Sequence, residues 1–277
     1  MKRLSLLFFL SVIFYSFAFS HGAAMHDEIF YYILFEQDVQ LNTKEQEKMS
    51  LLYYSSRVAI DQYNGSYENE LNYLKSKGIK TIPDIAVIDY TGNSHHQRYT
   101  HRGWTFEYSR DLGNWVARKQ LILDTTQKVF SFESEEQHEA FSAFMYYIHI
   151  LGDHDGDKKD NSMDRIALGG RADQIDILDE LSSIYLPKLF KSQKDKVNYL
   201  CERLQNINRK CSNLLRRTGD GYDDRNVKRD VKELSDEEYI IYQRYAKETL
   251  KVLTEEVPNL LLNEKWFVKA FPSVKKK

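Results

Sequence analysis

Proline and glycine are scarce in this chain, and their scarcity restricts the folds that the sequence can adopt. The 277 residues include only four prolines and twelve glycines. A β fold with many tight turns uses both residues often, whereas long helices exclude them from their interiors. Leu, Glu, Lys, Gln and Tyr are abundant instead, and this composition favours helices. The sequence therefore predicts an all-α protein.

Apolar residues recur at helical spacing along most of the chain. The most apolar of the predicted helices, 135–151, should be central. No internal repeat or composition change marks a domain boundary, so we expect a single multi-helix domain. Residues 260–271 should pack back against the predicted helices, which cover 25–37, 49–63, 68–75, 83–90, 115–129, 135–151, 174–186, 194–217 and 236–256.

Local signals predict how some of these helices begin and end. Thr43-Lys-Glu-Gln46 resembles a capping box ahead of helix 49–63. Pro187 should end helix 174–186, because proline has no backbone N–H to donate. His138 lies in a charged stretch at the start of the central helix and is predicted to be a surface residue.

The first twenty residues have the pattern of a cleavable signal peptide. Lys2 and Arg3 precede an apolar run over 4–19, and the small residues Ala18 and Ser20 stand just before the expected cut between Ser20 and His21. The run is about sixteen residues, shorter than the ~20 that a spanning helix needs. We expect a mature chain of residues 21–277, secreted or periplasmic, with no transmembrane segment after cleavage.

The overall charge is close to balanced. The chain has 39 Lys and Arg against 41 Asp and Glu, a formal net charge of −2. This balance does not by itself call for nucleic acid or a membrane surface as a partner.

Cys201 and Cys211 are the only cysteines. In an exported protein they can form a disulfide, but on one straight helix ten residues would separate them by about 15 Å, too far to bridge. Pairing would require a helix break near 206–208. A disulfide and two free thiols both remain open, with neither cysteine catalytic.

Two separate stretches contain residues suited to binding a metal ion. His149 and Asp153 are four apart and would project from one helix face, where an imidazole and a carboxylate can hold one divalent cation. Cleavage before His21 would expose an α-amine that chelates metal together with its carbonyl oxygen, and His26 can supply a further ligand. Without a metal, His149 would be a hydrogen-bonded histidine of the core, and the segment from His21 to His26 would be a frayed, solvated terminus.

Taken jointly, these residues resemble the superfamily of zinc-dependent phospholipases C and single-strand (fungal-type) nucleases. The resemblance is carried by an aromatic residue at 21 five positions before His26, by an Asp and then a His between residues 84 and 101, and by His149-x-x-Gly-Asp153. It covers most of the mature chain. It implies a helical domain with a zinc cluster at the bottom of a cleft, and cleavage of phosphoesters.

The resemblance also implies a ligand set for two zinc ions. His21, His26 and Asp153 would bind one zinc, and Asp153 would bridge to a second zinc held by Asp84, His101 and His149. Asp84 would also orient the attacking water as the catalytic residue. Asp89 competes with Asp84, and His95 and His96 compete with His101.

The chain departs from the family at the third metal site. Lys159 stands where the family has a histidine, and no histidine follows His154. Asp176 and Glu180 have a compatible spacing with Asp in place of His, although ordinary helix-surface charge explains this pair as well. His154 is a further substitute ligand. We therefore expect two zinc ions and an incomplete third site.

The same loop also approximates a calcium-binding loop. Residues 153–164 place acids at the first, third, fifth and twelfth positions, but Lys158 occupies the position where such loops have glycine. A solvated acidic loop is the simpler interpretation.

These observations lead to two hypotheses of function. The first is an exported, metal-dependent phosphoester hydrolase, phospholipase C-like or nuclease-like, in which a zinc cluster activates water against a phospholipid headgroup or a nucleic acid. The second is a noncatalytic periplasmic or surface binding module that retains the helical metal-binding fold. The missing histidines after His154 motivate the second.

Overall fold

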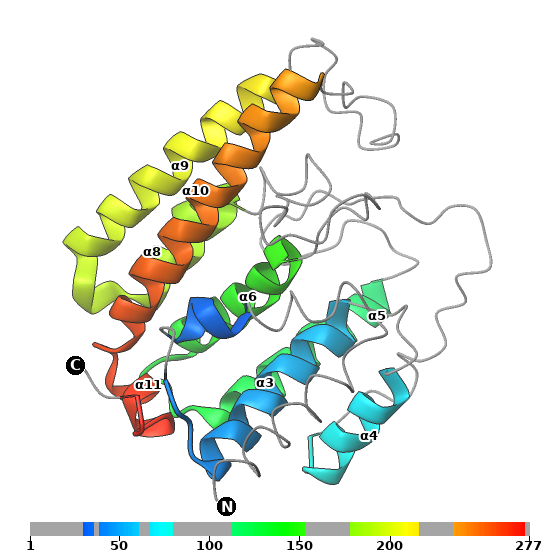
Figure 1. Cartoon of the computed structure of the whole chain (residues 1–277). Helices are drawn as coiled ribbons and strands as arrows, with labels where there is room; N and C mark the ends of the chain where they lie inside the picture. Colours follow the sequence, from blue (N-terminus) through cyan, green and yellow to red (C-terminus); the bar gives the residue numbers. More distant parts are fainter. Residues whose placement is uncertain are drawn as a thin grey trace, which may run out of the picture.

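The structure is a computed structural model, and it describes residues 30–35, 39–60, 67–79, 112–152, 178–215 and 235–274. Within these ranges the regular elements are helices and no strand occurs, in agreement with the predicted all-α class. The elements, labelled as in Figure 1, are α3 (Thr43–Ile60), α4 (Tyr67–Ser76), α5 (Leu112–Val129), α6 (Glu135–Gly152), the π-helix η3 (Leu181–Tyr185), α8 (Leu186–Leu189), the 3-10 helix η4 (Lys191–Gln193), α9 (Lys194–Leu215), α10 (Asp236–Leu261) and α11 (Lys265–Ala270).

Helix α6 lies at the centre of the described fold, as its sequence predicts. Residues 140–149 are all buried, and ten consecutive residues cover every face of a helix. Helices α3 and α5 pack on one side of α6, and η3 and α8 pack on the other (Figure 1). The buried apolar residues of these helices, together with those of α9, α10 and α11, form one connected core.

The N-terminus of α3 is capped one residue earlier than the sequence predicts. The Oδ1 atom of Asn42 accepts hydrogen bonds from the backbone N–H groups of Lys44 at 3.0 Å and Glu45 at 3.2 Å. The Glu45 carboxylate in turn accepts from the backbone N–H of Asn42 at 2.8 Å. The capping box is therefore Asn42 with Glu45, and the predicted pair of Thr43 and Gln46 is wrong.

The end of α4 shows why a glycine stands there. The N–H of Ile79 donates to the Leu74 carbonyl at 3.1 Å, and the N–H of Gly78 donates to the Lys75 carbonyl at 2.9 Å. This pair of bonds is the Schellman motif, which requires a left-handed residue, and Gly78 has a φ of 71°. A larger residue at position 78 would strain this helix end.

Two helices continue through prolines at which the sequence predicts, or permits, an end. Pro187 lies in the first turn of α8, directly after the π-helix η3, where the N–H of Leu186 bonds back to the Leu181 carbonyl. The wider π turn makes room for the proline ring, which would clash with a carbonyl in an α-helix. Helix α10 likewise contains Pro258. The predicted helix end at Pro187 is therefore wrong.

Helices α9 and α10 run antiparallel, side by side (Figure 1). Arg203 pairs with Glu256 at 2.8 Å, and Lys210 lies over the ring of Tyr245. Both cysteines lie on α9, which has no break between them, and both are buried free thiols. Burial raises the pKa of each thiol to about 12, which keeps it protonated and unreactive.

The C-terminal segment packs back on the start of α3, as expected for 260–271. The N–H of Ser273 donates to Glu45 at 2.6 Å, and the Lys48 ammonium donates to the Ala270 carbonyl at 2.6 Å. An aromatic cluster closes the same end of the molecule. Its rings lie within 6 Å of one another in successive pairs and come from Phe35, Phe130, Phe132, Phe141, Trp266, Phe267 and Phe271.

Among the described residues, no helix is both long enough and apolar enough to cross a bilayer.

Replacing Asn42 by Ala should lower the free energy of unfolding by about 0.5–2 kcal/mol, because two N–H groups of the first turn lose their acceptor. Thr43→Ala, one residue later at an exposed position, should change it by less than about 0.5 kcal/mol. Urea denaturation of both variants measures the difference. A larger loss in Thr43→Ala than in Asn42→Ala would contradict the assigned cap.

Candidate functional site

His149 lies close to the C-terminal end of α6 and is enclosed by aromatic side chains. Only 1% of its surface is exposed. The ring of Phe30 lies edge-on to the imidazole, with centroids 6.3 Å apart, and the ring of Tyr53 on α3 lies 6.2 Å away at 35°. The imidazole is thus held in a defined place on the central helix, in contact with two other parts of the chain.

The contact of Phe30 with His149 lies near two of the candidate ligands in sequence. Phe30 follows His26 by four residues, and His149 precedes Asp153 by four residues. His26 and Asp153 themselves lie outside the described residues.

A buried chain of polar side chains backs the His149 pocket. The Arg57 guanidinium donates to the Tyr53 hydroxyl at 3.4 Å and pairs with the Glu70 carboxylate of α4 at 3.2 Å. The Arg57 and Glu70 side chains are 9% and 8% exposed. Tyr53, Arg57 and Glu70 do not stand out as functional residues in the sequence. The i, i+4 spacing of Tyr53 and Arg57 is visible in the sequence, but their link to Glu70 on another helix is not.

Glu180, proposed as a ligand for a third metal, is engaged in the core. The Tyr147 hydroxyl of α6 donates a hydrogen bond to its carboxylate, and the Tyr185 ring lies 5.6 Å from that of Tyr147. Burial raises the pKa of Tyr147 far above its usual value, and the Glu180 carboxylate raises it further. This hydrogen bond gives Glu180 a structural role between α6 and η3.

His149 and Glu180 lie on different sides of α6. Tyr147, which binds Glu180, is two residues from His149, and two residues rotate by about 200° around a helix. The face with His149 meets Phe30 and Tyr53, whereas the face with Tyr147 meets η3. The structure therefore does not bring these two candidate ligands together.

The other candidate ligands lie outside the described residues. They are His21, His26, Asp84, His101, Asp153, His154 and Asp176, with the competitors Asp89, His95 and His96. Within the described ranges, no group of three or more His, Cys, Asp or Glu side chains is arranged to hold a metal ion. Of the predicted zinc ligands, the described part of the chain supplies the imidazole of His149.

His138 is not the surface residue that its sequence context predicts. Its Nε2 atom lies 3.0 Å from the Leu123 carbonyl and 2.9 Å from the Thr126 hydroxyl, and its ring stacks on Phe132 at 4.8 Å. Burial lowers the pKa of His138, partly offset by the bond to Leu123. The residue fastens α6 to α5, because it lies on the face that α5 covers.

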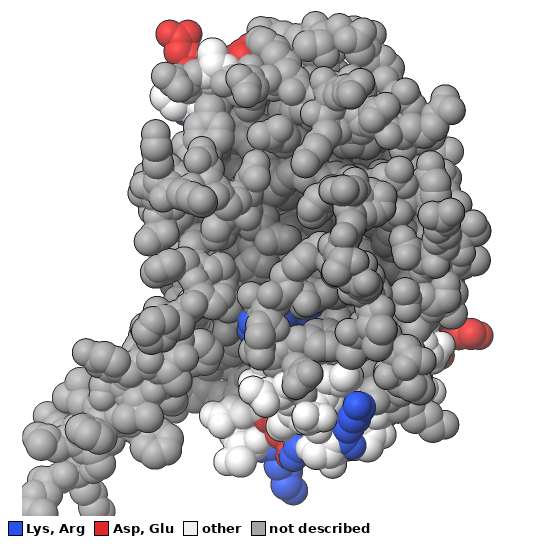
Figure 2. Space-filling model, turned by 90° about the vertical axis from the view of Figure 1, so that its right-hand side faces the viewer, with Lys and Arg blue, Asp and Glu red and all other residues white. Residues whose placement is uncertain are grey.

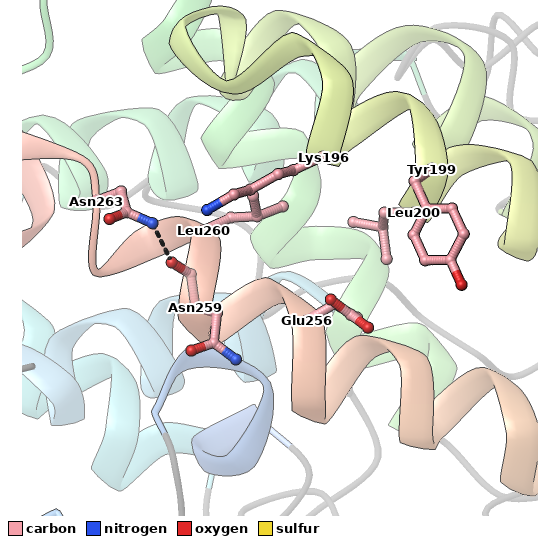
Figure 3. Close-up of a pocket in the computed structure, with 7 residues that line it drawn as sticks. All are labelled: Lys196, Tyr199, Leu200, Glu256, Asn259, Leu260 and Asn263. Atoms are coloured by element: carbon pink, nitrogen blue, oxygen red, sulfur yellow. Dashed lines mark hydrogen bonds between the residues drawn. The ribbon is translucent and has the colours of Figure 1, made fainter. Parts of the chain in front are cut away.

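Two grooves on the described surface are lined in part by α9. One, of about 470 Å³, is drawn in Figure 3 and is lined by Lys196, Tyr199, Leu200, Glu256, Asn259, Leu260 and Asn263. The Asn263 amide is used internally, donating to the Asn259 carbonyl at 2.7 Å. A second groove, of about 590 Å³, shares Tyr199 with the first. Neither groove contains a predicted zinc ligand.

Charges on the described surface are mixed. Figure 2 shows one face, on which the described residues include both basic and acidic side chains. Several basic groups are paired, as with Lys119 and Glu139 at 2.8 Å between α5 and α6.

Comparisons with known proteins identify no relative of this chain. No family model, no curated protein and no solved structure matches this chain.

Replacing Tyr147 by Phe should lower the free energy of unfolding at neutral pH by about 1–3 kcal/mol, because a buried carboxylate loses a donor. Tyr199→Phe, at a side chain that is 60% exposed, should change it by less than about 0.5 kcal/mol. Urea denaturation of both variants provides the measurement.

The pH dependence gives a second readout. The raised pKa of Tyr147 means that the folded state favours the neutral phenol. The stability that this preference adds is complete below the unfolded pKa of about 10 and is lost as the pH rises further. Between pH 9 and 11 the wild type should lose stability faster than Tyr147→Phe. Parallel alkaline curves would contradict the assigned role.

Proposed function

We propose that this protein is an exported, zinc-dependent phosphoester hydrolase that works in the manner of the zinc phospholipases C and single-strand nucleases, which its motifs resemble. The supporting observation is the contact of Phe30 with His149. Phe30 follows His26 by four residues and His149 precedes Asp153 by four, so their contact supports one shared metal site. The rest of the fold, all-helical where described, is compatible with this family.

The donor chemistry fits zinc. His149 offers an imidazole nitrogen, His26 and His101 offer two more, and Asp84 and Asp153 offer carboxylate oxygens, all of which are ordinary zinc ligands. The His21 amine and carbonyl complete the set after signal cleavage. Zinc would supply Lewis-acid activation of water and neutralisation of charge on the phosphoryl oxygens.

The residues of this chain have separate tasks in the proposal. The rings of Phe30 and Tyr53 hold the His149 imidazole in place and exclude solvent from its sides. Asp84 orients the attacking water and accepts its proton. The substrate is a phospholipid headgroup, a nucleic acid or a small phosphoester, and a comparison of hydrolysis of phosphatidylcholine vesicles and single-stranded DNA distinguishes them.

A noncatalytic binding module with the same fold is the second candidate. Lys159 replaces a family histidine, and Glu180 is bound by Tyr147. A protein of this kind would bind zinc yet hydrolyse neither of those substrates nor bis(p-nitrophenyl) phosphate.

Purified mature protein should contain about two zinc ions and hydrolyse bis(p-nitrophenyl) phosphate, and a chelator should abolish the activity. His149→Phe keeps a ring in the aromatic pocket but removes both nitrogens, so turnover should be lost while the protein stays folded. His138→Gln, on the same helix, is the matched control and should keep its zinc. Zinc-free protein without chelator-sensitive activity would falsify the proposal.

The N-terminus provides an independent test. A methionine left before His21 converts the α-amine to an amide, so zinc should bind more weakly at the site shared with His26. An extension of the same length at the C-terminus is the control. Metal titration by calorimetry compares the two, and equal affinities would show that His21 is not a ligand.

A further inference from the structure

Four side chains from three helices form a continuous path that ends at the His149 imidazole. Glu70 of α4 pairs with Arg57 of α3 at 3.2 Å, and Arg57 donates to the Tyr53 hydroxyl at 3.4 Å. The Arg57 guanidinium also lies 6.0 Å from the centre of the Tyr53 ring, and the same ring lies 6.2 Å from that of His149. Each side chain along this path therefore contacts the next one.

The ion pair in this path is buried, with the Arg57 and Glu70 side chains 9% and 8% exposed. Taking both charges of Arg57 and Glu70 out of water carries a desolvation penalty that apolar side chains of similar size would avoid. What the ion pair adds is a fixed direction, because a planar guanidinium bonds its partners only in defined geometries. The carboxylate of Glu70 sets the position of Arg57, and Arg57 sets the position of the Tyr53 hydroxyl.

We infer that Glu70 and Arg57 are positioning residues, which hold the Tyr53 ring against His149 and thereby fix the orientation of its imidazole for metal binding. This inference rests on the proposed function for the metal itself. The orientation of the imidazole is a property of the protein alone.

The opposite wall of the pocket is Phe30, whose ring meets the imidazole at 70°. Phe30 also packs edge-on against Tyr53, with ring centroids 5.6 Å apart. The three rings therefore form one packed set, in which a displaced Tyr53 would displace both neighbours. Arg57 bonds to Tyr53, and the Tyr53 ring contacts both Phe30 and the imidazole, so Tyr53 connects the ion pair to His149.

The double variant Arg57→Met with Glu70→Leu tests the inference. It removes both charges together, so no unpaired charge is left buried and the protein should remain folded. The zinc dissociation constant should rise by about 10–100-fold, the usual effect of losing a group that orients a metal ligand. Tyr53→Phe removes only the hydroxyl that accepts from Arg57 and should give a smaller rise in the same direction.

Leu71→Ala is the matched control for loosened packing. Leu71 neighbours Glu70 on α4 and is 5% exposed, so its truncation weakens the contact of α4 with the core without touching the ion pair. This variant should be less stable and yet bind zinc as the wild type does. If it loses zinc affinity as the double variant does, the ion pair acts only through helix packing and the inference is overturned.

A second readout needs no metal. The ring proton resonances of His149, assigned by their absence in His149→Phe, should be displaced by the ring currents of Phe30 and Tyr53. At constant pH they should move toward their unfolded positions in the double variant and stay in place in Leu71→Ala. Unchanged resonances in the double variant overturn the inference. A moved resonance in a protein that binds no zinc overturns the proposed function and leaves the positioning role standing.

Discussion

Enclosure of α6 on every side is the constraint on which the described fold depends. Residues 140–149 are buried without interruption, and the large side chains of Phe141 and Phe144 are among those that are completely inaccessible. Full burial of one such side chain contributes about 1.5–3 kcal/mol, so exposing any face of α6 would be costly. The helix therefore needs neighbours all round, and α3, α5, η3 and α8 supply them.

Because residues 140–149 of α6 are enclosed, each polar side chain in that stretch must be accommodated by a particular neighbour. Ser142 lies 2.7 Å from the Thr126 hydroxyl of α5, and Tyr147 donates to Glu180 next to η3. The rotation of α6 is thus fixed on two sides by directional bonds as well as by packing. That rotation decides which way His149 faces, and it faces Phe30 and Tyr53.

The sequence predicts the helices well because their periodicity is local, and it fails where distant contacts decide. Asn42 and Thr43 are both good caps, each followed three residues later by Glu or Gln, so the local pattern alone does not choose between them. The continuation through Pro187 depends on a π turn, and the burial of His138 depends on α5. The free thiols follow from the unbroken α9, which the sequence left open.

The candidate site can also be predicted from the sequence only in part. The sequence identifies His149 from its residue type and spacing, and the structure adds its enclosure. The sequence cannot reveal the buried ion pair of Arg57 and Glu70, because the pair forms between two helices. In the sequence, Glu70 resembles any surface acid in a charged helix. The sequence likewise cannot reveal that Glu180, with its plausible spacing to Asp176, is turned into the core.

The position of Glu180 bears on how many metals the proposed centre can hold. Its carboxylate binds Tyr147 on the side of α6 away from the Phe30 and Tyr53 pocket. To serve a cluster that includes His149, Glu180 would have to release Tyr147, whose phenol would then be buried without that acceptor. A third metal in the same cluster would thus depend on His154 or Asp176. A two-metal centre requires no such rearrangement, since its proposed ligands do not include Glu180.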